Sequence, residues 1–406
     1  MEQPGTSQAP IPFVWHPRTR RHDPSAEIWL GVRTPGTEVV ERVNVIREAL
    51  IRAGHPEVTA SDPDPEALLA VHAAGMIEHL RTINDAWIVG GYALDPGQDR
   101  VVPYVFPTAA MLGGLPLRRP TATHARAGQY CYATMTLIGP GTWDAVEAAA
   151  GAALTAVDLV AEAAWVAHGR GAVASGSTGS GEPGSGSTGS RESGSGSRRR
   201  GTAAPMAYAL SRPPGHHAAR AAFGGSCYLN NAAIAAEALR ARGARRVAVL
   251  DIDAHHGNGT QAIFYHRADV LYGSVHVDPA AGWFPHFMGF ADETGDGAGA
   301  GTNHNIPVPA RCGDDRWLTG VQELIEHTRA FAADALVVSL GVDAAIHDPE
   351  SPLRVTSDGL RATGILLGSL GLPTVAVQEG GYHLPSLGGL VADCLAGLAE
   401  GAARAR

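Results

Sequence analysis

Short runs of apolar residues that alternate with helical patterns constrain the fold of this 406-residue chain more than any other feature. A strand without polar residues on either face must be covered by helices on both sides, which is the arrangement of parallel sheets. The pattern therefore predicts an α/β fold in which helices cover both faces of a central parallel sheet. The expected strands are 207–211, 246–253, 269–277, 335–341 and 373–378, and the expected helices are 145–167, 232–242, 317–330, 360–370 and 387–399.

One segment departs from this pattern. Residues 175–200 consist mainly of Gly and Ser and carry almost no apolar side chains, so they cannot offset the entropy lost on ordering. We expect a flexible surface loop there. Because strands and polar motifs continue beyond it, we predict that it is an insertion within a single domain spanning residues 1–406.

Charge and composition exclude several classes of function. The formal charge is −9, which argues against a nucleic-acid partner, and all 31 basic residues are Arg, which excludes lysine Schiff-base chemistry and a lysine-containing phosphate loop. The four scattered cysteines fit reduced thiols. The N-terminus lacks a signal-peptide layout, and acidic residues interrupt the Ala-rich segment 145–167. We therefore expect a cytoplasmic protein without a membrane partner.

The strand at 246–253 ends in a cluster of metal-binding side chains. Asp253 and His255 lie two residues apart in an extended segment, so both can point toward one ion. A carboxylate and an imidazole are suitable Zn²⁺ ligands. Asp343 follows the strand at 335–341 and is a candidate third ligand, which would leave the fourth position open, as in catalytic zinc sites. Taken singly, these residues could equally cap loops and helices.

Two further strand ends carry groups suited to acid–base and oxyanion chemistry. His216 and His217 follow Arg-Pro-Pro-Gly, and adjacent histidines can be tuned by separate partners. Tyr382 follows Gly380 and Gly381, whose backbone can approach a site closely, and its phenol can donate a hydrogen bond to a developing oxyanion. Without the other motifs, two surface histidines and an ordinary glycine turn would be the simpler interpretation.

The motifs RPPGHH, DIDAHHGNGTQ, SLGVD and QEGGYH resemble those of the zinc-dependent histone deacetylase superfamily. Within it, the chain is most similar to the acetylpolyamine amidohydrolase branch, and segments such as VHAAGMIEHL, GPGTW and GGSCYLNNAA extend the resemblance over nearly the whole chain. The resemblance implies a single-domain arginase/deacetylase-like fold. It also implies an enzyme that removes acetyl or small acyl groups from an amine, such as acetyl-lysine, an acetylpolyamine or an N-acyl metabolite.

The same resemblance implies roles for individual residues. A catalytic Zn²⁺ would be held by Asp253, His255 and Asp343. His217 would be the general base, with His216 as its electrostatic companion. The remaining catalytic roles would be orientation of His216 by Asp251, a hydrogen bond to His217 from Asn258, and donation to the substrate carbonyl by Tyr382.

The resemblance further implies a structural K⁺, a substrate channel and a dimer. The K⁺ would lie near Asp251 and Ser274 and would bind backbone carbonyls including that of Val275. The channel would be lined by Phe284, Ser226 and Gly225. Residues 107–130 resemble the loop that mediates dimer formation in the acetylpolyamine amidohydrolase branch, which implies a homodimer.

Two departures from the family bear on the substrate. No Asp or Glu occurs between residues 100 and 143, where polyamine-directed relatives carry acidic side chains, so this stretch is a poor cage for a polycation. Ser226 stands where relatives usually place an aromatic channel wall. We expect a wider tunnel opposite Phe284 that tolerates substrates other than a linear acetyl-lysine-like chain.

Two other functions fit parts of this pattern. An arginase-like ureohydrolase would use two Mn²⁺ ions, but the segments after Asp253 and Asp343 lack the extra carboxylates that bridge two metals. A non-catalytic binder of acylated ligands would keep the fold and lose catalytic groups, yet His216, His217 and Tyr382 are all present. A single-metal amidohydrolase is therefore favoured.

Overall fold

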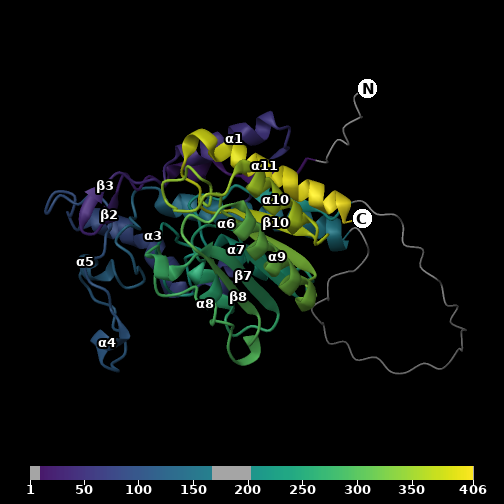
Figure 1. The fold of residues 1–406 in the computed structure, drawn as a ribbon. Helices are drawn as coiled ribbons and strands as arrows, with labels where there is room; N and C mark the ends of the chain where they lie inside the picture. Colours follow the sequence, from purple (N-terminus) through teal and green to yellow (C-terminus); the bar gives the residue numbers. More distant parts are fainter. Residues whose placement is uncertain (1–9, 167–202, 406) are drawn as a thin grey trace, which may run out of the picture.

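The computed structural model describes residues 10–166 and 203–405, and within them a mostly parallel-stranded core is visible (Figure 1). Eight parallel strands form one sheet in the order β4-β1-β5-β10-β9-β6-β7-β8, and a small antiparallel hairpin lies apart from it. The sheet strands are β1 (Phe13–Trp15), β4 (Glu57–Thr59), β5 (Met206–Ala209), β6 (Val247–Asp251), β7 (Val270–Val277), β8 (Asn303–Val308), β9 (Ala335–Leu340) and β10 (Thr374–Gln378), and the hairpin pairs β2 (Glu27–Trp29) with β3 (Val32–Thr34).

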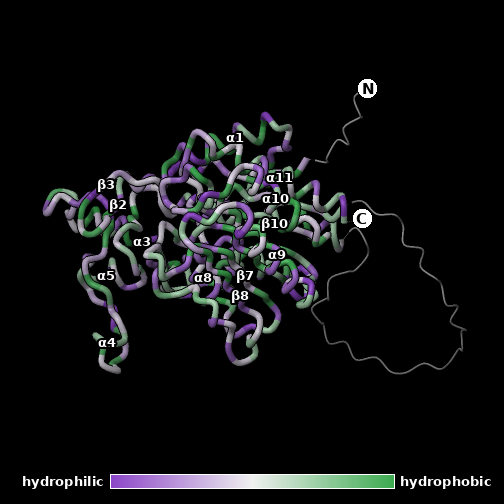
Figure 2. The backbone as a smooth tube through the Cα atoms, viewed as in Figure 1, coloured by the Kyte–Doolittle hydropathy of each residue, from purple (hydrophilic) through white to green (hydrophobic). Residues whose placement is uncertain are grey.

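Each face of the sheet has its own hydrophobic core. Side chains alternate between the faces along a strand, so Val247 and Val249 of β6 join one core while Ala248 and Leu250 join the other. Figure 2 colours the backbone by hydropathy, and hydrophobic residues, in green, occur along β7 and β10. The first core is covered by α2 (Pro65–Val71), α3 (Ala74–Val89), α6 (Thr142–Ala161) and α7 (Asn231–Ala241), and the second by α1 (Glu41–Arg52), α9 (Asp314–Phe331), α10 (Ser357–Gly368) and α11 (Leu384–Arg404).

The predicted α/β class, with helices on both faces of a parallel sheet, is confirmed, and the five predicted strands are all present. Sequence patterns missed β8, because Asn303, His304 and Asn305 make it too polar for an apolar run. They also missed β1 and β4, which are only three residues long. The order of the strands, in which β5 lies between β1 and β10, depends on pairing between distant segments and has no local signature.

Helix α6 and the five-residue helical turn that follows it, Glu162–Val166, are unusually rich in apolar residues. Within the described part of the chain, Thr142–Trp165 is the one helical segment long and apolar enough to cross a membrane, with a mean hydropathy of 1.3. Its alanines and valines are buried, and it packs against β5, β1 and α7. Its contacts are those of a core helix, as the interrupted Ala-rich pattern predicts.

The Gly/Ser-rich insertion at residues 175–200 lies outside the described residues. The segments on either side of it belong to the same sheet, because Phe13 and Val14 of β1 pair with Tyr208 and Ala209 of β5. This pairing supports the prediction that the chain is a single domain interrupted by an insertion.

Acid should destabilise the fold through a buried histidine next to the sheet's carboxyl edge. The Asn230 backbone N–H donates to His72 Nε2 at 2.8 Å, while His72 Nδ1 lies 3.0 Å from the Ala219 carbonyl oxygen, so the ring is neutral with its proton on Nδ1. Burial lowers the pKa of His72 from 6.5 to about 4. The contribution of His72 to stability is therefore fully present above pH 6.5. It is lost as the pH falls from 6.5 toward 4, because the unfolded state binds the proton first.

We expect His72 alone to account for up to about 3 kcal/mol of the stability lost between pH 7 and pH 4. Urea titrations at several pH values measure this loss. In His72→Gln the pH-dependent part should shrink by that amount, whereas His266→Gln, which changes an exposed histidine, should follow the wild type. An identical pH dependence in His72→Gln and wild type would contradict the prediction.

Candidate active site

Four loops that follow neighbouring strands converge at the carboxyl edge of the sheet. His216 and His217 follow β5, Asp253 and His255 follow β6, and Asp343 follows β9. Tyr382 follows β10. Because all these strands are parallel, their carboxyl ends meet at one edge, which is where open α/β sheets bind ligands.

The three predicted zinc ligands meet at one point. His255 Nδ1 lies 3.1 Å from Asp253 Oδ1 and 3.0 Å from Asp343 Oδ2, and one ligand atom from each residue lies within 4.8 Å of the others. Ligands about 2.0–2.2 Å from one zinc ion in tetrahedral geometry stand roughly 3.3 Å apart, so this spacing fits a single ion. Burial, and next the charge of Asp253, raises the pKa of Asp343 to about 8, and a divalent cation between the two carboxylates would offset both effects.

The backbone holds both carboxylates in place. The Gly380 N–H donates to Asp253 Oδ2 at 2.7 Å, and the Ala254 N–H donates to Asp343 Oδ1 at 2.7 Å. A Cβ atom on Gly380 would overlap the carboxylates of both Asp253 and Asp343, so only glycine allows this close approach. The first glycine of the Gly-Gly turn therefore serves the metal ligands, and the second leads to the tyrosine.

His216 is held as a cation. Its Nδ1 lies 3.0 Å from Asp251 Oδ2, and its Nε2 lies 3.9 Å from Asp253 Oδ1. Burial opposes the charge, but the carboxylates of Asp251 and Asp253 outweigh it and raise the pKa of His216 to about 10. The predicted companion of the general base is thus paired with Asp251 as expected.

His217 is held neutral, with a defined tautomer. Its Nδ1 lies 2.7 Å from Asn258 Oδ1, which can only accept, so the ring proton is on Nδ1 and Nε2 carries the lone pair. Asn258 is oriented in turn because its Nδ2 donates to Tyr132 Oη at 3.2 Å, and Tyr132 donates to the His217 carbonyl at 2.9 Å. Burial, and next the charge of His216, holds the pKa of His217 well below its usual value. Such a ring can accept a proton.

The loop of Tyr382 is fixed from two sides. The backbone N–H groups of Tyr382 and His383 donate to Asp348 Oδ2 at 2.7 and 3.2 Å. The guanidinium carbon of Arg42 lies 4.5 Å from the centroid of the Tyr382 ring. Burial raises the pKa of Tyr382 well above its usual value, so the phenol keeps its proton and can donate it in a hydrogen bond.

A cavity of about 490 Å³ opens above these groups, a size typical of small-molecule sites. His217, His255 and Tyr382 form part of its lining, together with the three predicted channel residues Phe284, Ser226 and Gly225. Gly225 has φ +58°, and a Cβ there would overlap the rings of His217 and Phe284. Ser226 has a left-handed backbone at φ 59°, and its short side chain forms this part of the cavity lining.

The acidic groups of this cavity come from a part of the chain that the sequence patterns did not single out. Glu27 of β2 and Glu350 line the cavity, whereas the stretch 100–143 contributes only Met135. Burial, and next the charge of Glu350, raises the pKa of Glu27 to about 7. Residues 100–143 thus supply no carboxylate to the cavity, and the two carboxylates that line it come from other loops.

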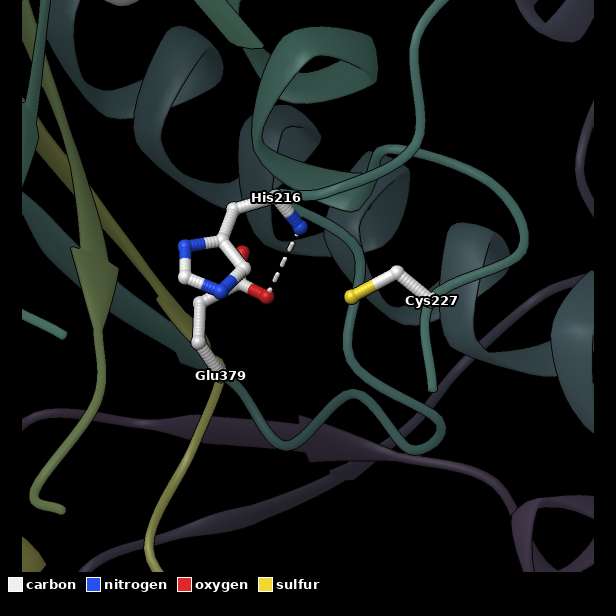
Figure 3. Close-up of side chains that lie close together, drawn as sticks. All are labelled: His216, Cys227 and Glu379. Atoms are coloured by element: carbon white, nitrogen blue, oxygen red, sulfur yellow. Dashed lines mark hydrogen bonds between the residues drawn. The ribbon is translucent and has the colours of Figure 1, made fainter. Parts of the chain in front are cut away.

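A second group of potential metal ligands includes His216 itself. His216, Cys227 and Glu379 face one another (Figure 3), and all three are buried. Glu379 Oε2 already accepts the N–H groups of Gly215 and His216 at 2.7 and 3.1 Å, and burial raises the pKa of the Cys227 thiol well above its usual value. His216 Nδ1 is already paired with Asp251 and Glu379 Oε2 with two backbone N–H groups, so the polar atoms of this group have partners within the protein.

The residues predicted to surround K⁺ lie on adjacent strands. Asp251 of β6 pairs in register with Ser274 of β7, and Val275 follows it. Asp251 Oδ2 also accepts from Tyr272 Oη at 3.2 Å, and Ser274 Oγ lies 2.8 Å from His276 Nδ1. The set offers carboxylate, hydroxyl and carbonyl oxygens, which suit a hard cation.

Comparison with known proteins gives a consistent result. The histone deacetylase domain matches residues 37–398 of the chain. The chain belongs to the histone deacetylase family. It is 36% identical to the acetylpolyamine amidohydrolase of Mycoplana ramosa, over 92% of this chain and 95% of the relative, and 38% identical to that of Burkholderia pseudomallei, over 92% and 94%. The crystal structure of acetylpolyamine aminohydrolase from B. pseudomallei superposes with a TM-score of 0.80 at 36% identity, covering 96% of this chain and 99% of the other.

Family membership makes this chain a deacetylase, an enzyme that hydrolyses amide bonds. The predicted resemblance to the histone deacetylase superfamily and to its acetylpolyamine amidohydrolase branch is confirmed. The arginase-like and non-catalytic alternatives are correspondingly disfavoured. Within the described residues, the second ligand group is also the wrong kind for a bridged metal pair, because it shares no carboxylate with the first.

Several residues of this deacetylase's site had no signal in the sequence patterns. They are Glu27, Glu38, Arg42, Tyr132, Asp348, Glu350 and Glu379. Each acts on the site through a contact with a residue far away in the chain. The one available hint was a charged residue in an otherwise apolar setting, as for Glu379 directly after β10.

Proposed function

We propose that this deacetylase uses one Zn²⁺, held by Asp253, His255 and Asp343, to remove an acetyl or small acyl group from a substrate that carries a distal ammonium group. The observation that supports the proposal best is the convergence of these three ligands next to a cavity that Glu27 and Glu350 also line. The relatives' names include acetylpolyamine amidohydrolases, whose substrates carry such a group.

The chain's own groups divide the work of hydrolysis between them. When bound, Zn²⁺ would polarise the substrate carbonyl and lower the pKa of a coordinated water. His217 Nε2 takes a proton from the attacking water and returns it to the leaving amine, while Asn258 keeps the ring in the required tautomer. His216, held cationic by Asp251, adds positive potential beside the developing negative charge. The Tyr382 hydroxyl donates to the oxyanion.

The substrate class follows from charge at the cavity mouth. Burial, and next the charge of Glu350, raises the pKa of Glu27, and a cation near the two carboxylates would relieve their mutual repulsion. An α,ω-diamine acetylated at one end places its free ammonium several ångströms from the amide. A neutral N-acyl amine offers nothing to these carboxylates.

This substrate preference can be measured with three probes: an N-acetylated diamine, a neutral acetamide of the same chain length, and an acetyl-lysine peptide. We expect the wild type to prefer the diamine over the neutral amide at least tenfold in kcat/KM, a difference of about 1.4 kcal/mol. In the double variant Glu27→Gln/Glu350→Gln this preference should disappear through a higher KM for the diamine, with little change for the neutral amide.

Glu323→Gln is the matched control, because it removes one carboxylate from the exposed face of α9, outside the cavity lining. It should keep the wild-type preference. Preference for the diamine that survives in the double variant, or no preference in the wild type, would contradict a cation-binding mouth. A wild-type preference for the acetyl-lysine peptide would point to protein substrates instead.

The proposal also includes a structural K⁺ and a homodimer. A structural K⁺ at Asp251, Ser274 and Val275 is supported by their oxygen-rich pairing on adjacent strands. A homodimer is supported by the arm that carries α4 (Ala109–Leu112), which extends away from the body (Figure 1) and exposes Met111 and Leu115. A cytoplasmic location and a wider tunnel at Ser226 stay predictions.

A further inference from the structure

We propose that a buried ionic triad of Arg42, Glu38 and Arg212 positions Tyr382 relative to the catalytic histidines, so that Arg42 and Glu38 are positioning residues for hydrolysis. All three side chains are at most 2% exposed, and none of them lines the cavity. The inference rests on the proposed function, in which the Tyr382 hydroxyl donates to the oxyanion.

Arg42 holds the loop of Tyr382 by its backbone. Its Nε donates to the Gly381 carbonyl and its Nη2 to the Glu379 carbonyl, each at 2.6 Å. The same guanidinium lies over the Tyr382 ring, where a cation is attracted by the ring's negative face. Since Asp348 binds the N–H groups on the other side of the loop, both the ring and the peptide groups of this turn are fixed.

Arg212 is itself part of the loop of the histidines and anchors that loop to Thr19 and Glu38. It directly precedes Pro-Pro-Gly-His216, and its Nη1 donates to the Thr19 carbonyl at 2.8 Å. Its Nε and Nη2 donate to Glu38 Oε1 and Oε2 at 2.8 and 2.9 Å, a bidentate pair of fixed geometry. Glu38 Oε1 also accepts from Arg42 Nη1 at 2.8 Å. One carboxylate therefore joins Arg42 on α1, which holds the loop of Tyr382, to Arg212 on the loop of the histidines.

Glu379 provides a second link between the same loops. Its carbonyl oxygen accepts from Arg42, while its carboxylate accepts the backbone N–H groups of Gly215 and His216 (Figure 3). Any movement of Arg42 along the loop of Tyr382 is thereby transmitted to the backbone of His216. The oxyanion donor and the proton-transfer pair are held as one unit.

Stability alone does not explain a triad of this kind. Removing three charges from water costs free energy that their mutual attraction barely repays, and buried ion pairs can often be replaced by apolar residues without loss of stability. Burial lowers the pKa of the adjacent His22 to about 4, so this ring brings no further charge to Glu38. What the triad does provide is a fixed geometry with directional hydrogen bonds to the backbone carbonyls of Glu379, Gly381, Thr19 and Glu38.

A double-mutant cycle between Arg42→Lys and Tyr382→Phe tests the inference. Lysine keeps the charge but cannot reach Glu38 and both carbonyls with one planar group. We expect Arg42→Lys to lower kcat about tenfold in the wild-type background and less than twofold in the Tyr382→Phe background, because Arg42 acts through the phenol. A merely structural role would lower kcat by the same factor in both backgrounds, and that result would overturn the proposal.

The kcat values are compared only for variants whose fold and zinc content match those of the wild type. Should Arg42→Lys not yield folded protein, Glu38→Asp enters the same cycle, because it keeps the charge and withdraws the shared carboxylate by one methylene; the same non-additive loss is expected. Arg267→Lys is the control: Arg267 also binds two carboxylates, Asp269 and Glu237, near the amino end of β7, and kcat should stay within twofold in both backgrounds.

The cycle separates failure of this inference from failure of the proposed function. Near wild-type turnover in Tyr382→Phe itself would remove the phenol from the mechanism, and the proposed function would fail in that part. A slow Tyr382→Phe with fully additive losses would leave the mechanism intact and overturn only the positioning role of the triad.

Discussion

Replacing Asp343 by asparagine is expected to lower kcat/KM by on the order of 10³, because it weakens the site for the ion that supplies several kcal/mol of transition-state stabilisation. The amide can still accept the Ala254 N–H, so the loop keeps its main anchor while the ligand loses its negative charge. Zinc bound per chain should fall well below one in the same preparation.

Metal analysis and kinetics together check this prediction. Chelation of the wild type should reproduce the loss of activity, and added Zn²⁺ should restore it in the wild type only. Asp296→Asn, which changes an exposed carboxylate outside the site, should keep full zinc and activity. Full turnover of the metal-free wild type would contradict a metal-dependent mechanism, and two equivalents of manganese would favour the arginase-like alternative.

Tyr382→Phe should retain zinc and fold normally but turn over 10²–10³ times more slowly, the loss of roughly one oxyanion donor. Phenylalanine keeps the ring against the Arg42 guanidinium, and the backbone N–H groups of the loop still reach Asp348. The change thus removes the hydroxyl and little else. Because the donor acts on charge that develops in the transition state, KM should change far less than kcat.

Steady-state kinetics on the acetylated diamine measures the effect, with zinc content and thermal unfolding as checks on the protein. Tyr265→Phe, on the loop after α8 (Asn258–Phe264), removes a phenol outside the cavity and is the matched control. Turnover near that of the wild type in Tyr382→Phe would exclude the phenol as an oxyanion donor.

The candidate metal ligands and the pair of histidines were predictable because each lies in a loop that follows an apolar strand. Asp253, Asp343 and His217 are separated widely in the sequence, but parallel strands bring their carboxyl ends to one edge. The ligand geometry follows once those strands pair. The resemblance to deacetylase motifs added roles that spacing alone leaves open.

The acidic cavity mouth could not be predicted in this way. Glu27 lies on a short hairpin strand and Glu350 in an irregular loop, and neither has a periodic pattern or a motif around it. Residues 100–143, which lack Asp and Glu, contribute a single methionine to the cavity. A charge acts through space, so its effect on a ligand depends on position in the fold and not on its neighbours in the chain.

Taken by itself, the amino-acid sequence determined the parallel α/β class, the chemistry of the metal ligands and the pair of histidines, since apolar periodicity and ligand types are properties of short segments. The tertiary structure alone decided which carboxylates line the cavity and which buried charges contact the loops beside it. Glu38 reaches Arg212 across 174 positions, and Arg42 reaches Gly381 across 339. Contacts of that span exist only after the chain has folded, because nothing in the local sequence of either partner specifies the other.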